Sequence, residues 1–263
     1  MCSPMSQYID GEDYAGVQDR GRGAAESKKP RALDLFCGAG GATRGLQMAG
    51  FHVTGVDIKP QPRYVGDVFH QADALTFPLE GFDFIWASPP CQSYSSAMRH
   101  LATPQPMLID PIRERIEASG APWVIENVLG APLRNPIVLC GTMFGMRIHR
   151  HRLFEAPWWF TLVPDCFASQ PVLNPHRSES RQRIYAEFGK QDPEKLWRDE
   201  MGVTWMSRHE TREAIPPAYS EFIGRQALEF LSQPEADCWP TATASPQIQG
   251  AEEPQKEVGG VAL

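Results

Sequence analysis

The segment Leu33-Asp34-Leu35-Phe36-Cys37-Gly38-Ala39-Gly40-Gly41 decides how the chain folds. Its first half continues an apolar run, Ala32 to Phe36, that predicts a buried parallel strand. The glycines then allow a sharp turn and a close approach of backbone to ligand. A helix is expected from Ala42 to Met48, with Gly50 as its C-cap. This order of strand, glycine turn and helix presents free N–H groups and a positive helix end to a ligand.

A second strand, His52 to Val56, runs directly into Asp57. This carboxylate follows the glycines by about 20 residues, the place where dinucleotide-binding folds hold a ribose hydroxyl. A nucleotide-type ligand and an ordinary strand-to-helix turn explain these two segments equally well.

Further strands are expected where short apolar runs end at turn signals. With the two already named, they are Ala32–Phe36, His52–Val56, Phe82–Ala87, Trp123–Glu126 and Ile137–Cys140. Because helical or loop segments alternate with them, the sequence predicts an α/β fold with a doubly wound, mostly parallel sheet. A helix from Ala218 to Leu231 is expected to complete it.

The composition fits one large domain of ordinary core content, since 42% of the 263 residues are hydrophobic. The sequence contains no apolar run of about 18 residues, so it predicts no membrane span. The N-terminus lacks the apolar region of a signal peptide. The six cysteines lack Cys-x-x-Cys spacing and the density of a disulfide scaffold. We therefore expect reduced thiols, no metal, no membrane partner and a cytoplasmic protein.

The net charge of −7 is unevenly distributed. Residues 233–263 carry five acids and one base, a local charge of −4. Residues 147–183 carry six arginines and three acids, a local charge of +3. The basic run is either a solvated face or, if it borders a site, a surface for an anionic partner.

Composition also divides the chain. Residues 1–29 are expected to be a disordered leader, and 30–155 an α/β domain, which the resemblance described below implies is the cofactor-binding and catalytic domain. Residues 156–200 predict a small insertion, 201–232 a C-terminal helix that completes the domain, and 233–263 a disordered acidic tail.

Cys91 follows the strand 82–87 after Ser88-Pro89-Pro90. The two prolines stop the strand and fix the backbone, so the thiol is expected at the carboxyl edge of the sheet, where such folds bind ligands. A cysteine there can be a nucleophile if its thiolate is stabilised. A buried structural thiol is the commoner fate of a free cysteine.

Glu126 ends the strand that begins at Trp123, and a parallel sheet places it on the same edge as Cys91. A carboxylate at the end of an apolar strand is costly to bury without a partner. In the later segment Arg147–Glu155, a strand would put Arg150 and Arg152 on one face and the two histidines on the other. Paired arginines suit an anionic partner or a catalytic carboxylate, and a surface strand is the alternative.

These segments, in this order, resemble the DNA cytosine-5 methyltransferases. Asp34 to Gly41 is similar to the first motif of that family and Pro90-Cys91-Gln92 to its nucleophile motif. Glu126-Asn127-Val128 resembles its glutamate motif, and Arg150-His151-Arg152 its Arg-x-Arg motif. The resemblance covers about residues 31–155, and a weaker resemblance extends over residues 201–231.

The resemblance implies methyl transfer from S-adenosylmethionine to C5 of cytosine in double-stranded DNA. Cys91 would add to C6 and make C5 nucleophilic. Glu126 would hydrogen-bond the base and help to protonate N3, supported by Arg150 and Arg152. Because the target atoms are inaccessible in a duplex, the cytosine is expected to be flipped out.

The resemblance also implies binding residues. Those expected around the cofactor are Phe36, Gly38, Ala39, Gly40, Gly41, Asp57 at its ribose, Ile58, Asp73 at its adenine amine, Ala74 and Pro90. Those expected to meet DNA are Gln92, Ser95, Arg177, Arg181 and Arg183.

The chain departs from the family in three places. Ile148 stands where the Arg-x-Arg motif usually begins with Gln, and Arg212-Glu213-Ala214 where the final motif usually has Gly-Asn-Ser. The segment between Glu155 and Met201 is short for a target-recognition region. Together these features resemble the small, phage-type members, which implies a monomer in a bacterial or phage-infected cell.

Two other functions stay open. The same chemistry on RNA, for example tRNA, is disfavoured because the Cys-Phe-Thr signature of the tRNA-acting relatives is missing. A non-catalytic binding module is disfavoured because the cysteine, glutamate and arginines are all present.

Overall fold

The computed structural model describes residues 29–91, 107–158, 160, 163, 165–166 and 192–233. Its strands are β1 (Arg31–Leu35), β2 (His52–Asp57), β3 (Val68–Gln71), β4 (Phe84–Ala87), β5 (Trp123–Asn127), β6 (Ile137–Leu139) and β7 (Arg152–Glu155). Its helices are α1 (Gly41–Ala49), α2 (Ile109–Ala118), the 3₁₀ helix η2 (Gly141–Phe144), α4 (Pro193–Glu200), α5 (Arg208–Glu213) and α6 (Pro217–Leu231).

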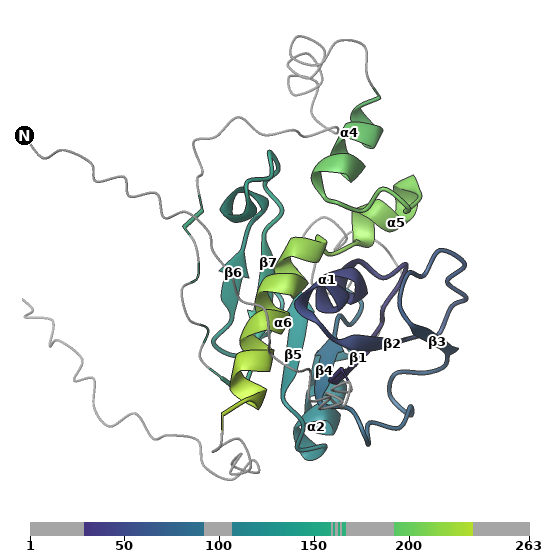
Figure 1. Ribbon diagram of the computed structural model, residues 1–263, viewed down its shortest axis with the longest axis vertical. Helices are drawn as coiled ribbons and strands as arrows, with labels where there is room; N and C mark the ends of the chain where they lie inside the picture. Colours follow the sequence, from purple (N-terminus) through teal and green to yellow (C-terminus); the bar gives the residue numbers. More distant parts are fainter. Residues whose placement is uncertain are drawn as a thin grey trace, which may run out of the picture.

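The strands form one sheet in the order β3-β2-β1-β4-β5-β7-β6 (Figure 1). The five strands from β3 to β5 are parallel, whereas β7 is antiparallel to both β5 and β6. The strand order reverses between β1 and β4, and ligands of open α/β sheets bind at the carboxyl edge of such a reversal.

Helices cover both faces of the sheet because the central strands are apolar on both sides. On one face Ala32, Phe84, Trp86 and Val124 share a buried cluster with residues of α1 and α6, and Figure 1 shows these two helices side by side. On the other face Leu33, Leu35, Ile85 and Ile125 pack with Ile112 and Ile116 of α2. The predicted doubly wound, mostly parallel α/β fold is confirmed.

The contact between α1 and α6 depends on a glycine. A Cβ added to Gly45 would lie 2.0 Å from the carbonyl oxygen of Pro217, so no side chain fits there. α1 begins at the glycine turn, and the segment that precedes α6 packs against the same turn. The two paired helices therefore lie beside the glycine turn. Among the described residues no helix is long and apolar enough to cross a membrane.

The predicted strands and the two predicted helices all occur, with boundaries within two residues. β3 was not predicted because it is an edge strand whose side chains are largely exposed, so it lacks an apolar pattern. The expected strand over 147–155 is wrong in extent: β7 starts only at Arg152, and Arg150 precedes it. The leader and the tail fall outside the described residues except for Lys29 and Gln233.

A buried ion pair fastens α2 to β7. Arg113 donates from Nε to Glu155 Oε1 at 2.7 Å and from Nη2 to Glu155 Oε2 at 2.8 Å. The two side chains are 2% and 4% exposed. Glu155 Oε2 also accepts the backbone N–H of Arg134 at 2.7 Å, so this carboxylate is held by three donors.

We expect Arg113→Ala to lower the free energy of unfolding by about 3–5 kcal/mol, because it leaves the Glu155 carboxylate buried without its cation. Urea unfolding followed by circular dichroism measures the change. Arg225→Ala is the matched control, since Arg225 pairs with Glu221 on the surface and is 60% exposed. A loss no larger than that of the control would contradict the assignment.

Candidate functional site

The glycine turn has the backbone of a ligand-binding loop. Phe36, Gly38 and Gly40 have φ values of 63°, 50° and 88°. Phe36 is notable because a side chain disfavours this left-handed conformation, and such strain occurs mostly at functional sites. No atom lies within 4 Å of a Cβ built on Gly38, so the turn is open there.

Asp57 lies at the carboxyl end of β2 and contacts this turn. Its Oδ2 accepts the N–H of Gly38 at 3.0 Å and its Oδ1 accepts the N–H of Lys59 at 2.9 Å. The apolar side chain of the next residue, Ile58, is 66% exposed. A fixed carboxylate, an exposed apolar side chain and an open glycine turn fit a nucleoside cofactor, whose ribose is polar and whose base is flat and apolar.

The other residues expected at the cofactor divide by burial. Ala39 and Ala74 are buried, with exposures of 4% and 3%. Asp73 is exposed, and its Oδ1 accepts the N–H of Leu75 at 2.9 Å. This contact closes a turn after β3, so Asp73 has a local structural role in addition to the predicted one.

Beneath the turn lies a buried carboxyl group that the sequence did not single out. Asp34 is fully buried and its Oδ2 accepts the hydroxyl of Thr43 at 2.5 Å. Its Oδ1 has no partner among the described residues. Burial raises the pKa of Asp34 to about 7, and the negative charges of Asp57 and Glu126 act in the same direction.

Cys91 follows β4 on the carboxyl edge of the sheet and is half-buried. The turn before it is fixed by Asn127, whose side-chain amide donates to the carbonyl of Pro89 at 2.9 Å. Burial raises the pKa of the Cys91 thiol, and the charge of Glu126 raises it further, while Arg152 partly offsets both. The surroundings therefore disfavour the thiolate form of Cys91 in this state.

Glu126 is 5% exposed and lies on β5, the strand next to β4. Its Oε1 lies 3.1 Å from Nε of Arg152. Burial raises the pKa of Glu126, although Arg152, Arg150 and a hydrogen bond with Ser88 act in the opposite direction. A raised pKa makes the protonated form of a buried carboxyl group more accessible, which suits a general acid.

The two arginines of Arg150-His151-Arg152 make different contacts. Arg150 donates from Nε and Nη2 to the carbonyl of Ala214, at 3.0 and 2.6 Å, and from Nη2 to that of Arg212 at 2.7 Å. Burial and the nearby Arg152 lower its pKa to about 9. Arg150 thus fastens the segment 212–214 to the site, and Arg152 contacts the glutamate.

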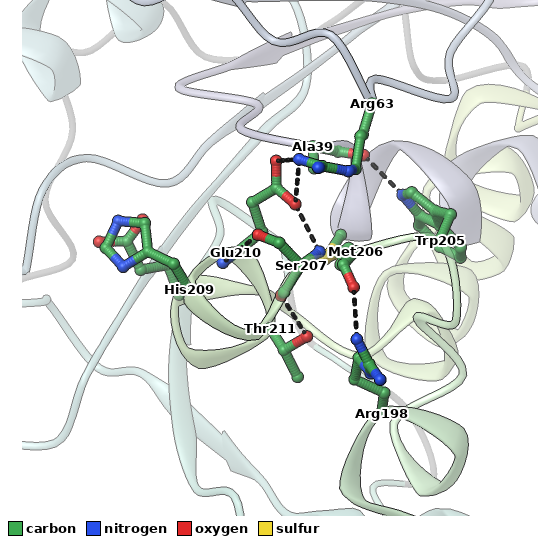
Figure 2. Close-up of polar contacts among 10 residues, drawn as sticks. Ala39, Arg63, Arg198, Trp205, Met206, Ser207, His209, Glu210 and Thr211 are labelled. Atoms are coloured by element: carbon green, nitrogen blue, oxygen red, sulfur yellow. Dashed lines mark hydrogen bonds and ion pairs between the residues drawn. The ribbon is translucent and has the colours of Figure 1, made fainter. Parts of the chain in front are cut away.

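The segment from Trp205 to Glu213 forms the other wall of the glycine turn (Figure 2). Trp205 donates from its indole to the carbonyl of Ala39 at 2.9 Å. Ser207 and Glu210 cap α5, and Glu210 also pairs with Arg63 at 3.2 Å. A Cβ on Gly41 would lie 2.4 Å from the carbonyl oxygen of Ile215, so this glycine is needed for the close packing.

The structure therefore gathers the glycine turn, Asp57, Cys91, Glu126 and Arg152 at the carboxyl edge of the sheet. Asn127 and Trp205 contribute to the site, and sequence reasoning did not assign them roles. Asn127 stands in the quoted Glu-Asn-Val triplet, which could have indicated it, whereas nothing local marks Trp205. The predicted DNA contacts lie outside the described residues: Gln92, Ser95, Arg177, Arg181 and Arg183.

Residues 31–131 match the sequence model of the family C-5 cytosine-specific DNA methylase. No curated protein matches the chain. Among solved structures, Dnmt2 methyltransferase of S. pombe is 14% identical, with a TM-score of 0.50 over 78% of this chain and 100% of the other. The methyltransferase EhMeth of Entamoeba histolytica has the same TM-score and coverage at 10% identity.

A third solved structure is described as a DNA modification methyltransferase encoded within an E. coli prophage. It is 20% identical, with a TM-score of 0.38. The match covers 48% of this chain and 45% of that one, so the chain spans under half the length of this relative. At these identities, the two matches with a TM-score of 0.50 show a shared methyltransferase fold.

Proposed function

We propose that this chain is a member of the C-5 cytosine-specific DNA methylases, the family whose sequence model matches residues 31–131, and that it transfers a methyl group from S-adenosylmethionine to carbon 5 of cytosine in DNA. One observation supports this activity most: a half-buried thiol and a buried ion pair, Glu126–Arg152, lie together beside an open glycine turn.

The residues present suit each step of this chemistry. In the first, the Cys91 thiol would lose its proton to solvent water and its Sγ would form a bond to C6 of a flipped-out cytosine. The C5–C6 double bond would move to C4–C5 while the protonated carboxyl group of Glu126 hydrogen-bonds N3 and gives it a proton. Burial raises the pKa of Glu126, which makes the protonated form of this carboxyl group easier to reach. Carbon 5 then carries the electron density that a methyl transfer needs.

When bound, S-adenosylmethionine supplies the methyl group as an electrophile. Phe36, Gly38, Gly40 and Asp57 would hold it at the glycine turn. Once C5 carries the methyl group, its proton would pass to solvent water and the C–H electrons would re-form the C5–C6 double bond. The Sγ–C6 bond would then break to release Cys91 as a thiolate, and N3 would return its proton to Glu126. Arg152 holds the Glu126 carboxyl group in place through its 3.1 Å contact.

Asp57→Ala is expected to weaken S-adenosylmethionine binding by roughly 1–3 kcal/mol, because it removes the acceptor for the ribose hydroxyls and the contact that fixes Gly38. Isothermal titration calorimetry measures the dissociation constant. Asp83→Ala is the matched control, since its carboxylate accepts the N–H of Arg31 at the opposite edge of the sheet. An unchanged dissociation constant for Asp57→Ala would remove Asp57 from the site.

Two experiments test the function as a whole. DNA from cells that express the protein is sequenced with a readout for 5-methylcytosine, which gives the modified sequence. An oligonucleotide of that sequence with 5-fluorocytosine at the target is then incubated with protein and S-adenosylmethionine. We expect a covalent complex that survives denaturation and that Cys91→Ala does not form. A covalent complex that forms only with the corresponding RNA would favour RNA as the substrate. If neither nucleic acid forms a covalent complex, the proposed enzymatic activity is contradicted.

A further inference from the structure

Four metal-ligating side chains converge on the side of the β6–β7 hairpin. Cys140 follows β6, His149 and His151 precede β7, and Cys166 lies further along the chain. The ligand atoms of these four residues all lie within 4.8 Å of one another. They come from three separate segments and the two cysteines are far apart in the chain, so the absence of Cys-x-x-Cys spacing, which led to the prediction of no metal, does not bear on them.

The distances within this cluster are those of a tetrahedral metal site. Cys140 Sγ lies 3.5 Å from Nδ1 of His149, and Cys166 Sγ lies 3.6 Å from Nε2 of His151. With zinc–sulfur and zinc–nitrogen bonds of about 2.3 and 2.05 Å, the sulfur–nitrogen edge of a zinc tetrahedron is about 3.6 Å. Both edges thus need almost no movement to accept the ion.

The fold holds the ligands at these positions. The β6–β7 register pairs Leu139 with Arg152, so Cys140 and His151 are the next pair along the ladder. A Cβ on Gly141 would lie 2.4 Å from the carbonyl oxygen of Ile148, which shows how closely the two segments approach. The hairpin therefore brings three of the four ligands together before any metal binds.

A polar group also supports the two sulfurs. The hydroxyl of Thr142 lies 3.5 Å from Cys140 Sγ and 3.6 Å from Cys166 Sγ. Hydrogen bonds of this kind orient the first ligands of protein metal sites and stabilise a thiolate charge.

We propose that Cys140, His149, His151 and Cys166 bind one zinc ion. Two thiolates and two imidazoles are a ligand set that selects zinc over magnesium or calcium, which prefer oxygen. Four protein ligands leave no open position, so the ion has a structural role and takes no part in methyl transfer. This inference does not depend on the proposed function.

The ligands alternate with the arginines of the site in the segment His149-Arg150-His151-Arg152. Fixing both histidines to one ion restricts the backbone from which Arg150 reaches Ala214 and Arg152 reaches Glu126. Cys166 belongs to the segment after β7, so the same ion ties the start of that segment to the hairpin. The zinc ion would therefore position the arginines and hold the chain that leaves the sheet.

Elemental analysis of the purified full chain tests the site. We expect about one zinc ion per chain in the wild type and a loss of most of it in Cys140→Ser, Cys166→Ser and His149→Asn. Cys91→Ala is the matched control, because it removes a half-buried cysteine outside the cluster, and its zinc content should equal that of the wild type. Zinc-free wild type, or equal zinc in all variants, would overturn the proposal.

A second measurement applies even where a ligand variant folds poorly. Thr142→Val keeps the side-chain shape and all four ligands, and we expect it to lower zinc affinity by roughly 10–100-fold in competition with a chelator. Cobalt added to the metal-free wild type should give the absorption bands of a tetrahedral thiolate site. A disulfide between Cys140 and Cys166, detected by mass under non-reducing conditions, or unchanged affinity in Thr142→Val would contradict the site.

Discussion

Cys91→Ser is expected to lower methyl transfer to DNA by roughly 10⁴-fold or more, the scale seen when a covalent nucleophile is removed. A serine hydroxyl is far less acidic than a thiol, and the site already disfavours a negative charge at this position because of burial and the charge of Glu126. The variant should keep its fold, because serine is nearly the size of cysteine and the residue is only half-buried.

Transfer of labelled methyl groups from S-adenosylmethionine to DNA measures this prediction, and calorimetry checks that the variant still binds the cofactor. Cys238→Ser is a suitable control, because this cysteine lies in the C-terminal tail, far along the chain from the motifs. Turnover by Cys91→Ser within a few-fold of the wild type would exclude Cys91 as the nucleophile.

Glu126→Gln is expected to lower turnover by roughly 10²–10⁴-fold, the usual contribution of general acid–base catalysis. Glutamine has the shape of the carboxyl group and can still accept a hydrogen bond from Arg152, but it cannot protonate N3. The same assay of methyl transfer measures the effect. The covalent complex with 5-fluorocytosine DNA should also form more slowly, since bond formation at C6 needs that proton.

Glu126→Gln should also shift the pKa of the Cys91 thiol, and the charges of the neighbouring residues give the direction of this shift. The negative charge of Glu126 raises the pKa of Cys91 and Arg152 lowers it. Removing the carboxylate therefore lowers the pKa, and alkylation by iodoacetamide should reach half its maximal rate at a lower pH than in the wild type. Cys91→Ala gives the background from the other cysteines.

Glu155→Gln is the matched control for Glu126→Gln. Glu155 is also a buried glutamate paired with an arginine in this sheet, but it lies on β7 and contacts Arg113 of α2. We expect its substitution to lower stability without a comparable loss of turnover per folded molecule. Equal losses of turnover in both variants would mean that Glu126 acts only through stability.

The sequence alone determined the elements whose signals are local. The run from Ala32 to Phe36 is apolar except for Asp34 and is followed by glycines, so β1, the turn and α1 follow from periodicity and backbone freedom. β4 and β5 were predicted in the same way. Because parallel strands end on the same edge, the nearness of Cys91 and Glu126 could also be inferred before the structure was known.

Tertiary structure decided what depends on residues far apart in the chain. The strand order, the edge strand β3 and the antiparallel β7 depend on which surfaces pack together. The distinct contacts of Arg150 and Arg152 depend on the position of Ala214 and Glu126. The cluster of Cys140, His149, His151 and Cys166 likewise forms only when β6 and β7 pair and the chain returns to the hairpin. Each of these contacts joins segments far apart in the chain, and neither segment contains a sequence pattern that indicates its partner. Long-range packing therefore decides these features and overrides local propensity.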